Sequence, residues 1–287
     1  RHGPRQVMYG SLGGVIRPRV IERLLDQTTY RLMLAEGYSE VIARVAAGRP
    51  LPVGGYATLL APNLSALDAP WSMQGMHQAA SRVLQAVARG EIIGIETDHD
   101  CDGQTSHAVL YESLTGMLKV PEQCIRSYIG HRLEEGYGLS EKLMQRILAD
   151  QPRPSLLLTA DNGSTDEPRI AQLKAAGIDV IVTDHHGLPP EGPPKSAYVC
   201  LNPSQETCEY PDASIAGCMV SWLLMAAVRR KAIEEGYLPE NTVSMTSVLD
   251  FVAVGTVADC VSLGKSINNR AVVHYGLQKI RRLERPC

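Results

Sequence analysis

The sequence predicts an α/β fold in which a mostly parallel sheet is flanked by helices. Short apolar runs alternate with stretches of helical periodicity through the middle of the 287-residue chain. Strands separated by helices of about 10 to 15 residues form βαβ units with parallel strands. Several apolar runs also end in carboxylates or histidines, and in such sheets the sites lie beyond the carboxyl ends of the strands. A helical N-terminal extension and a C-terminal linking helix complete the prediction.

The predicted elements alternate regularly. The first are a helical stretch over 18–47 and an amphipathic helix over 76–89 that ends at Gly90. The central elements are strand 92–95, helix 106–118, strand 125–129, helix 140–149, strand 156–159, helix 168–176, and strands 180–183 and 198–201. Beyond Asn202 the pattern becomes helical, over 215–235, 243–257 and 269–282.

Composition limits the class of protein. No apolar run reaches the roughly 18 to 20 residues that cross a bilayer, and the N-terminus lacks a signal-peptide pattern, so we expect a cytoplasmic protein. The cysteines include no Cys-x-x-Cys pair, which favours reduced thiols over disulfides. A zinc site built from Cys200, Cys208 and Cys218 would be poorly spaced. The formal charge of −3 excludes no substrate class.

The most informative stretch is 98–103, where acidic residues occupy alternate positions: Asp98, Asp100 and Asp102. Three like charges this close repel one another strongly unless a cation lies among them. An EF-hand calcium loop has a similar beginning, but it needs flanking helices and a glutamate at its twelfth position, which is Val109 here. The stretch therefore predicts a divalent metal site at the end of a strand.

Ligand-type side chains also follow three later apolar runs, namely Asp161, the triplet Asp184-His185-His186, and Asp259. Together these segments offer more ligands than one ion needs, whereas two ions sharing a bridging carboxylate would use them well. Carboxylate-rich sites with imidazole suit Mn²⁺ or Mg²⁺ better than structural zinc. Such ion pairs neutralise the charge that develops at a phosphoryl centre, so the pattern predicts phosphoester hydrolysis.

The order of these motifs resembles that of the DHH phosphoesterases. The matching segments are Asp98-x-Asp100-x-Asp102-Gly103, Asp161-Asn162-Gly163, Asp184-His185-His186 and Gly255-Thr256-Val257-Ala258-Asp259. The RecJ-like branch, which consists of bacterial single-strand-specific 5′→3′ DNA exonucleases, is similar at Arg132-x-x-Glu135-Gly136-Tyr137-Gly138-Leu139, at Asn202-Pro203, at Ala216-Gly217 and at Asn269-Arg270. The resemblance runs from about Leu67 to Ile280.

The resemblance implies a set of ligands for two Mn²⁺ or Mg²⁺ ions: Asp98, Asp100, Asp102, Asp161, His185 and Asp259. In the wider family a ligand can instead come from slightly upstream of Asp98, where this chain has Glu96. The resemblance further implies that His186 faces the substrate phosphate and that Asp184 orients an imidazole.

Arg132 and Arg270 are candidate phosphate clamps, because guanidinium groups bind phosphate oxygens bidentately. A structural alternative stays open for each of the four residues outside the ligand set. Asp184 can cap a turn, and His186 can be a structural histidine. Either arginine can form a surface salt bridge.

The leading functional expectation is a single-stranded DNA 5′→3′ exonuclease that releases mononucleotides. A nanoRNase or cyclic-dinucleotide phosphodiesterase would use the same metals on short substrates. A non-catalytic scaffold in a DNA-processing complex would keep the fold after losing ligands, but every ligand position is filled here. No partner protein is indicated.

The family also implies a domain organisation. We expect an N-terminal extension at 1–75 that packs on the core, a DHH catalytic domain at 76–265, and a linking helix at 266–287. RecJ-like enzymes carry a second domain after that helix, and we expect such a domain to be absent from this chain.

Overall fold

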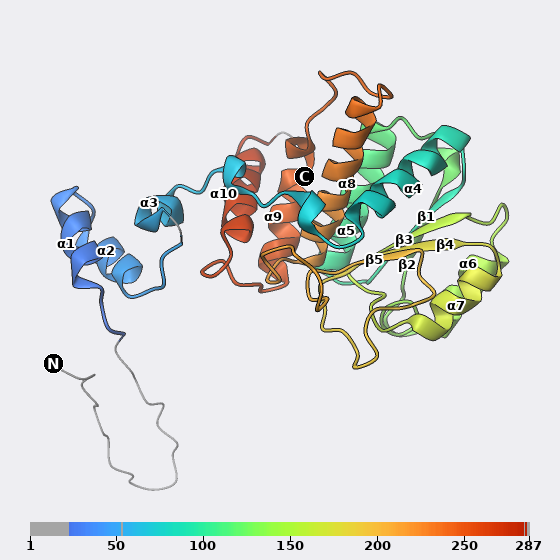
Figure 1. Ribbon diagram of the computed structural model, residues 1–287, viewed down its shortest axis with the longest axis horizontal. Coiled ribbons are helices and arrows are strands. Elements are labelled where there is room, and N and C mark those ends of the chain that lie inside the picture. Colours follow the sequence, from blue (N-terminus) through green and yellow to red (C-terminus); the bar gives the residue numbers. More distant parts are fainter. Residues whose placement is uncertain (1–22, 53, 284, 286–287) are drawn as a thin grey trace, which may run out of the picture. The chain divides into compact units, whose positions relative to one another are not determined.

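The computed structural model describes residues 23–52, 54–283 and 285, and the chain divides between Pro62 and Asn63 into two compact units (Figure 1). The first unit contains three helices, α1 (Gln27–Ala35), α2 (Glu40–Ala47) and α3 (Gly55–Leu60). Its small core is formed by Met33, Ala43, Ala46 and Leu59. The strands and the larger core belong to the second unit.

Five parallel strands form the sheet of the second unit, in the spatial order β2-β1-β3-β4-β5. They are β1 (Ile93–Thr97), β2 (Ile125–Ile129), β3 (Leu156–Ala160), β4 (Asp179–Thr183) and β5 (Val199–Leu201). The predicted parallel α/β sheet is therefore confirmed. Because β2 and β3 lie on opposite sides of β1, the strand order reverses there. Sheets of this kind bind ligands outside the carboxyl ends of the strands at such a reversal.

Helices cover both faces of the sheet, as Figure 1 shows. One face packs against α4 (Met76–Arg89), α5 (Cys101–Glu112) and α8 (Gly217–Glu234), and the other against α6 (Glu141–Ala149) and α7 (Glu167–Ala175). Successive side chains of a strand alternate between these faces. In β3, for example, Leu156 and Leu158 join the first layer and Leu157 joins the second. Burial on both faces explains why β3 and β4 are largely apolar, whereas the partly exposed edge strand β2 contains Arg126 and Ser127.

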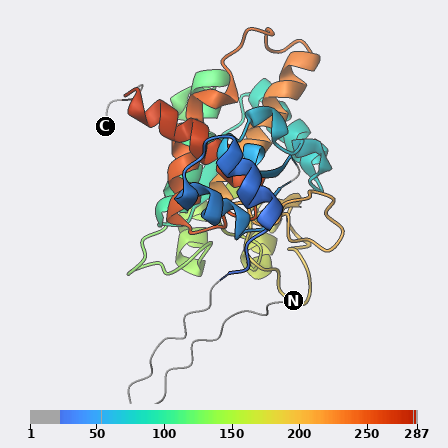
Figure 2. The same ribbon diagram turned by 90° about the vertical axis from the view of Figure 1, so that its left-hand side faces the viewer.

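Two further helices, α9 (Leu249–Ala258) and α10 (Ile267–Arg281), lie outside the first layer. α9 packs against α5 and α8, and α10 lies along α9, as Figures 1 and 2 show. The shorter helices are η1 (Leu64–Ala66), η2 (Pro70–Ser72), the π-helical turn η3 (Ser113–Met117), η4 (Glu122–Cys124) and η5 (Met245–Val248). Among the helices of the described residues, none combines the length and apolarity needed to span a membrane.

Three helices differ from their predicted bounds by more than two residues. The helix predicted over 243–257 is the short helix η5 followed by α9, which begins at Leu249. The helix predicted over 18–47 is divided by a turn at Gly37, whose φ of 88° suits glycine, and its first residues, 18–22, lie outside the described part of the chain. The helix predicted over 106–118 is α5, which begins earlier because the Asp100 carboxylate caps it by accepting a hydrogen bond from the Gly103 N–H at 3.0 Å. The acidic motif thus lies partly inside a helix.

Candidate metal centre

Loops at the carboxyl ends of the strands bring acidic side chains to His185, which follows β4. The Nε2 atom of His185 is 3.2 Å from Oδ1 of Asp161, the residue that follows β3. The same nitrogen is 3.7 Å from Asp259 Oδ2, just after α9, and 3.9 Å from Asp102 Oδ2, in the first turn of α5. Four separate segments therefore supply ligand-type side chains to one point.

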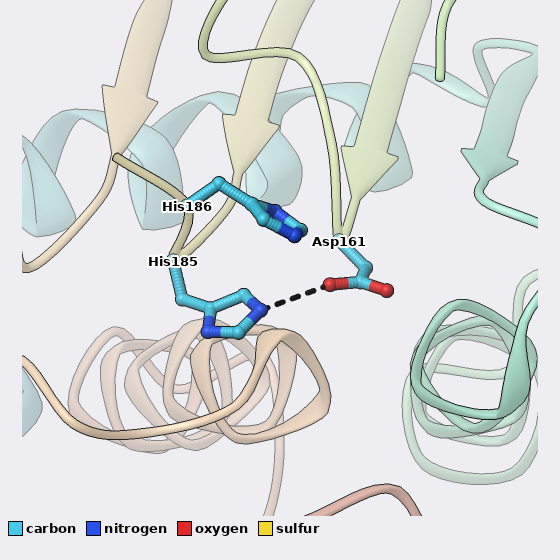
Figure 3. Close-up of side chains that lie close together, drawn as sticks. All are labelled: Asp161, His185 and His186. Carbon is cyan, nitrogen blue, oxygen red and sulfur yellow. Dashed lines mark ion pairs between the residues drawn. The ribbon is translucent and has the colours of Figure 1, made fainter. Parts of the chain in front are cut away.

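The candidate ligand atoms fall into two groups that share His185. One group is Asp161, His185 and His186, and the other is Asp102, His185 and Asp259. Within each group the atoms lie within 4.8 Å of one another. Figure 3 shows the first group, in which the His185 ring points toward the Asp161 carboxylate. Carboxylate oxygens combined with imidazole nitrogens suit hard or borderline divalent ions.

Asp161 presents its carboxylate from a left-handed turn. Its φ is 63°, a conformation that few residues other than glycine adopt, although aspartate does so more readily than most. The Asp161 N–H donates to the carbonyl of Thr183 at 2.9 Å, which ties the end of β3 to the end of β4. An unusual backbone conformation held in place by its surroundings is typical of functional sites.

Asp102 is held by the first turn of α8. The N–H of Gly217 donates to Asp102 Oδ2 at 2.6 Å, and the N–H of Cys218 donates to Oδ1 at 3.0 Å. The N-cap residue of α8, Ala216, provides no side-chain cap, so a carboxylate from another helix fills that role. The positive end of the α8 dipole also favours a negative group at this position.

Two glycines allow α8 and α9 to approach these carboxylates. A Cβ atom at Gly217 would lie 2.7 Å from Asp161 Oδ1. A Cβ atom at Gly255 would lie 2.2 Å from Thr105 Oγ1 and 2.7 Å from Asp102 Oδ1. Real Cβ atoms do not come this close to other heavy atoms, so both positions require glycine.

The electrostatics of the centre fit a bound cation. Burial, together with the charges of Asp102 and Asp100, raises the pKa of Asp161 to about 10. Burial also raises the pKa of Asp259. Asp161 Oδ1 and His185 Nε2 face each other, yet among the described residues neither has a hydrogen-bond partner. Buried polar atoms are almost always paired, so these two atoms match ligands of an ion.

Asp184 has a different environment from the other acids. Its Oδ1 accepts hydrogen bonds from the backbone N–H groups of His185 and His186 and from His186 Nδ1, and its Oδ2 accepts one from the Ser164 N–H. Burial raises the pKa of Asp184, but the hydrogen bonds from His186 and Ser164 outweigh it and hold the pKa below its usual value. Asp184 is thus placed to orient His186.

The remaining acids of the first motif lie at the edge of the cluster. Asp98 Oδ1 accepts from the His99 N–H at 2.7 Å and lies 2.6 Å from His99 Nδ1, while Asp100 caps α5. Neither belongs to the two groups that share His185. Glu96 is fully buried, and its Oε1 accepts from Asn162 Nδ2 at 3.2 Å. Burial raises the pKa of Glu96 well above its usual value.

The two arginines singled out in the sequence lie in different segments. Arg132 is exposed on the loop between β2 and α6, where its guanidinium donates to the Tyr137 hydroxyl and lies 5.1 Å from the centre of the Tyr137 ring. Arg270 lies in the first turn of α10, and its Nη1 donates to the Leu263 carbonyl at 3.4 Å. Their proposed contacts with phosphate remain predictions.

Sequence reasoning missed two kinds of residue at this site. The backbone amides of Gly217 and Cys218 carry no sequence signal for binding a carboxylate, although Ala216-Gly217 is part of the resemblance. The buried residues Ser164 and Asn202 form hydrogen bonds with Asp184 and His186. Asn202-Pro203 is part of the resemblance, but no role was predicted for Asn202, and Ser164 belongs to no motif noted in the sequence. The cysteines considered for zinc are free thiols, and neither candidate group includes one.

Comparison with known proteins places these motifs in context. The model of the DHH family, N-terminal domain, matches residues 92–256. The single-stranded-DNA-specific exonuclease RecJ of Haemophilus influenzae is 39% identical over 214 residues. That match covers 74% of this chain but 36% of the relative, so the chain spans little more than a third of that protein.

Two solved structures show the same arrangement of elements. A crystal structure of exonuclease RecJ bound to manganese is 32% identical, with a TM-score of 0.61, and the match covers 73% of this chain and 49% of that one. A crystal structure of RecJ from Thermus thermophilus in complex with Mn²⁺ is 26% identical, with a TM-score of 0.65, over 91% of this chain and 34% of that one.

Proposed function

This chain belongs to the DHH family, and from that premise we propose that it hydrolyses phosphodiester bonds with two divalent ions, Mn²⁺ or Mg²⁺. We propose further that it degrades single-stranded DNA in the 5′→3′ direction and releases mononucleotides. The RecJ relative of Haemophilus influenzae is named as a single-stranded-DNA-specific exonuclease, and both RecJ structures hold manganese. The order of motifs in this chain supports the same activity.

One observation carries the proposal. Asp161 Oδ1 and His185 Nε2 are buried, face each other at 3.2 Å and lack hydrogen-bond partners among the described residues, while Asp102 approaches the same imidazole. Each buried polar atom without a partner costs about 1–3 kcal/mol, and an ion bound between these two atoms would remove that cost for both of them. The geometry supports a centre completed by ions.

In the proposed centre Asp102, Asp161, His185 and Asp259 bind the ions, and Asp98 and Asp100 are further candidate ligands. Bound ions would neutralise the charge that builds on the phosphoryl group during in-line displacement. The chain itself keeps the ligands in place. The α8 amides fix the Asp102 carboxylate, and the bond to Thr183 fixes the turn of Asp161.

We propose that His186 contacts the substrate phosphate. Asp184 can only accept hydrogen bonds when it is ionised, so His186 Nδ1 carries the proton between them, and Nε2 remains for a ligand. The hydrogen bond to Asp184 raises the pKa of His186, against the opposing effect of burial. A protonated ring can donate to a phosphate oxygen and stabilise charge that develops there. Arg132 and Arg270 would hold other phosphate oxygens.

We propose the following organisation of the chain: a catalytic domain at 76–265, a linking helix at 266–287 and an N-terminal extension at 1–75. The family match, 92–256, lies within the first of these ranges, and α10 lies within the second. Both relations support the proposed boundaries.

Mn²⁺-dependent hydrolysis of four substrates tests the proposed activity. The substrates are 5′-phosphorylated single-stranded DNA, the same strand with a blocked 5′ end, a dinucleotide and a cyclic dinucleotide. We expect mononucleotides from the phosphorylated strand alone, and no product with the Asp102→Ala variant. Cleavage of only the short substrates would identify a nanoRNase or cyclic-dinucleotide phosphodiesterase instead. A chain that cleaves none of them and binds no Mn²⁺ would be a scaffold.

A further inference from the structure

Asn202 is a buried amide behind the metal centre that joins neighbouring loops of the site. It follows β5 directly and is fully buried. Its Nδ2 donates to the Ser164 hydroxyl and to the His186 carbonyl, each at 2.9 Å. Its Oδ1 accepts from the Ser204 N–H at 2.8 Å. The side chain is therefore fully hydrogen-bonded, and two of its three bonds reach the loops that carry site residues.

These bonds complete a closed ring of four residues. Asn202 bonds to Ser164, and the Ser164 N–H donates to Asp184 Oδ2 at 3.0 Å. Asp184 Oδ1 accepts from His186 Nδ1 at 2.8 Å, and the His186 carbonyl returns to Asn202. The ring joins the loops after β3, β4 and β5. It holds His186 at two points, the backbone carbonyl and the ring nitrogen.

His186 needs such support because packing does not supply it. Its side chain is 57% exposed, so it could adopt other rotamers if the hydrogen bonds were lost. Its ring centre is 4.5 Å from that of His185, and Figure 3 shows both rings beside Asp161. A small rotation of His186 would therefore change its position relative to the ligands. A displacement of about 1 Å at a reacting group can cost a hundredfold in rate.

We propose that Asn202 is a positioning residue that fixes His186 against the metal centre. Asn202 reaches His186 through the carbonyl of that residue, and it reaches Asp184 only through Ser164. It therefore acts on catalysis through His186, and its side chain forms no hydrogen bond with the proposed ion-binding residues Asp102, Asp161, His185 and Asp259. The proposal depends on the proposed phosphodiesterase activity for its kinetic test, but not for its spectroscopic test.

The kinetic test compares Asn202→Ala with Gln205→Ala. Gln205 is a matched control: it is a buried amide on the same loop that donates hydrogen bonds, at 3.0 and 3.2 Å, to the backbone carbonyls of Cys200 and Asn202. Its side chain does not take part in the ring of Asn202, Ser164, Asp184 and His186. We expect Asn202→Ala to lower kcat about 10- to 100-fold, with KM and the Kd for Mn²⁺ within about threefold of the parent. We expect Gln205→Ala to leave kcat within about threefold. Equal losses in both variants would overturn the proposal.

The spectroscopic test uses the full chain without substrate. Long-range ¹H–¹⁵N spectra of the histidine rings report which ring nitrogen carries the proton, and the signals of His186 are identified by their loss in His186→Gln. We expect the parent to show a proton on Nδ1 of His186, and Asn202→Ala to shift these signals while Gln205→Ala does not. Unchanged His186 signals in Asn202→Ala would refute the proposal. If the parent hydrolyses no substrate, the proposed function fails, and this spectrum still decides the role of Asn202.

Discussion

The two ends of the sheet both bury charged side chains, but they balance that charge differently. At the amino end, Arg82 donates to Glu91 Oε2 and to Asp179 Oδ2 at 2.7 Å each. Arg89 lies 3.8 Å from the other oxygen of Glu91, so this end matches two guanidinium groups with two carboxylates. At the carboxyl end, three carboxylates surround the imidazole of His185.

The difference lies in how the carboxylates are balanced by positively charged partners. Each carboxylate of the cluster around Arg82 has a guanidinium partner, although Arg82 Nη1 has no hydrogen bond among the described residues. Glu91 also accepts a hydrogen bond from the Ser155 hydroxyl. The cluster around His185 raises the pKa of Asp161 to about 10, chiefly through burial, and leaves one oxygen of that carboxylate unpaired among the described residues. Such a cluster is energetically balanced only when a cation joins it.

The largest effect should follow from removing a ligand at the carboxyl end. We expect His185→Ala and Asp161→Asn to lower kcat about a thousandfold or more, since the charge that develops at phosphorus would lose its compensation. Steady-state hydrolysis of 5′-phosphorylated single-stranded DNA measures the loss. Circular dichroism serves as the control, because both variants should remain folded. Near-normal turnover in either variant would contradict the assignment.

The next effect concerns the amino end. Replacing Arg82 with Met should destabilise the protein by about 3 kcal/mol, because Glu91, whose side chain is largely buried, would lose its main charged partner. Asp179 is 43% exposed and would be solvated instead. Urea unfolding at pH 7 measures this change. The kcat of the folded variant should equal that of the parent, since Arg82 lies at the opposite end of the strands from His185. An unchanged free energy of unfolding would show that the cluster does not stabilise the fold.

A smaller effect, the stabilisation of the fold by Mn²⁺, tests at which end of the sheet the ion binds. Mn²⁺ at a hundredfold excess over its Kd should raise the free energy of unfolding by about 2.7 kcal/mol, because the ion binds the folded state. Asp161→Asn should abolish this increase, whereas Glu91→Gln should retain it. Urea unfolding with Mn²⁺ and with EDTA gives the comparison. An equal increase in Asp161→Asn would place the ion elsewhere.

The smallest effect is the acid dependence of the amino end. Burial raises the pKa of Glu91, but the hydrogen bonds from Arg82 and Ser155 outweigh it and leave the pKa below its usual value of 4.5. A carboxylate with a lowered pKa stabilises the fold above pH 4.5, and this contribution disappears as the pH falls through the lower value. Between pH 5 and pH 3, the free energy of unfolding of Glu91→Gln should therefore fall by up to about 1 kcal/mol less than that of the parent. Parallel pH profiles would contradict this prediction.

The location of the site could be predicted from the sequence, because the carboxyl ends of parallel strands share one edge of a sheet. Asp161 and His185 each lie just beyond an apolar run, and both are found at that edge. The spatial order of the strands could not be predicted in the same way. β3 and β4 are similar apolar strands, so their residues alone do not specify which strands lie beside them. The order depends also on how the helices pack against the sheet.

The separate roles of the three acids in the first motif could not be predicted from the sequence either. They look equivalent there, yet Asp100 caps α5 and Asp98 accepts from its neighbour His99. Asp102 differs because it meets the amide of Gly217, 115 residues away in the chain. Asn202 is a similar case, since its bonds span 16 residues to His186 and 38 to Ser164. Contacts at such separations form only when the sheet is assembled.

Asp102 has two roles, because its carboxylate belongs to the candidate metal centre and also accepts hydrogen bonds from the first amides of α8. Its loss would therefore affect the stability of the fold as well as the proposed activity. Helix α8 is 18 residues long and largely buried, and its N-cap residue, Ala216, has no side chain that can bond to the first amides. A lineage that abandons catalysis can replace His185 freely. Replacing Asp102 would also remove an N-cap worth about 1 kcal/mol, unless Ser, Thr or Asp had first replaced Ala216. Among inactive descendants of such a chain, Asp102 should be the last of these acids to disappear.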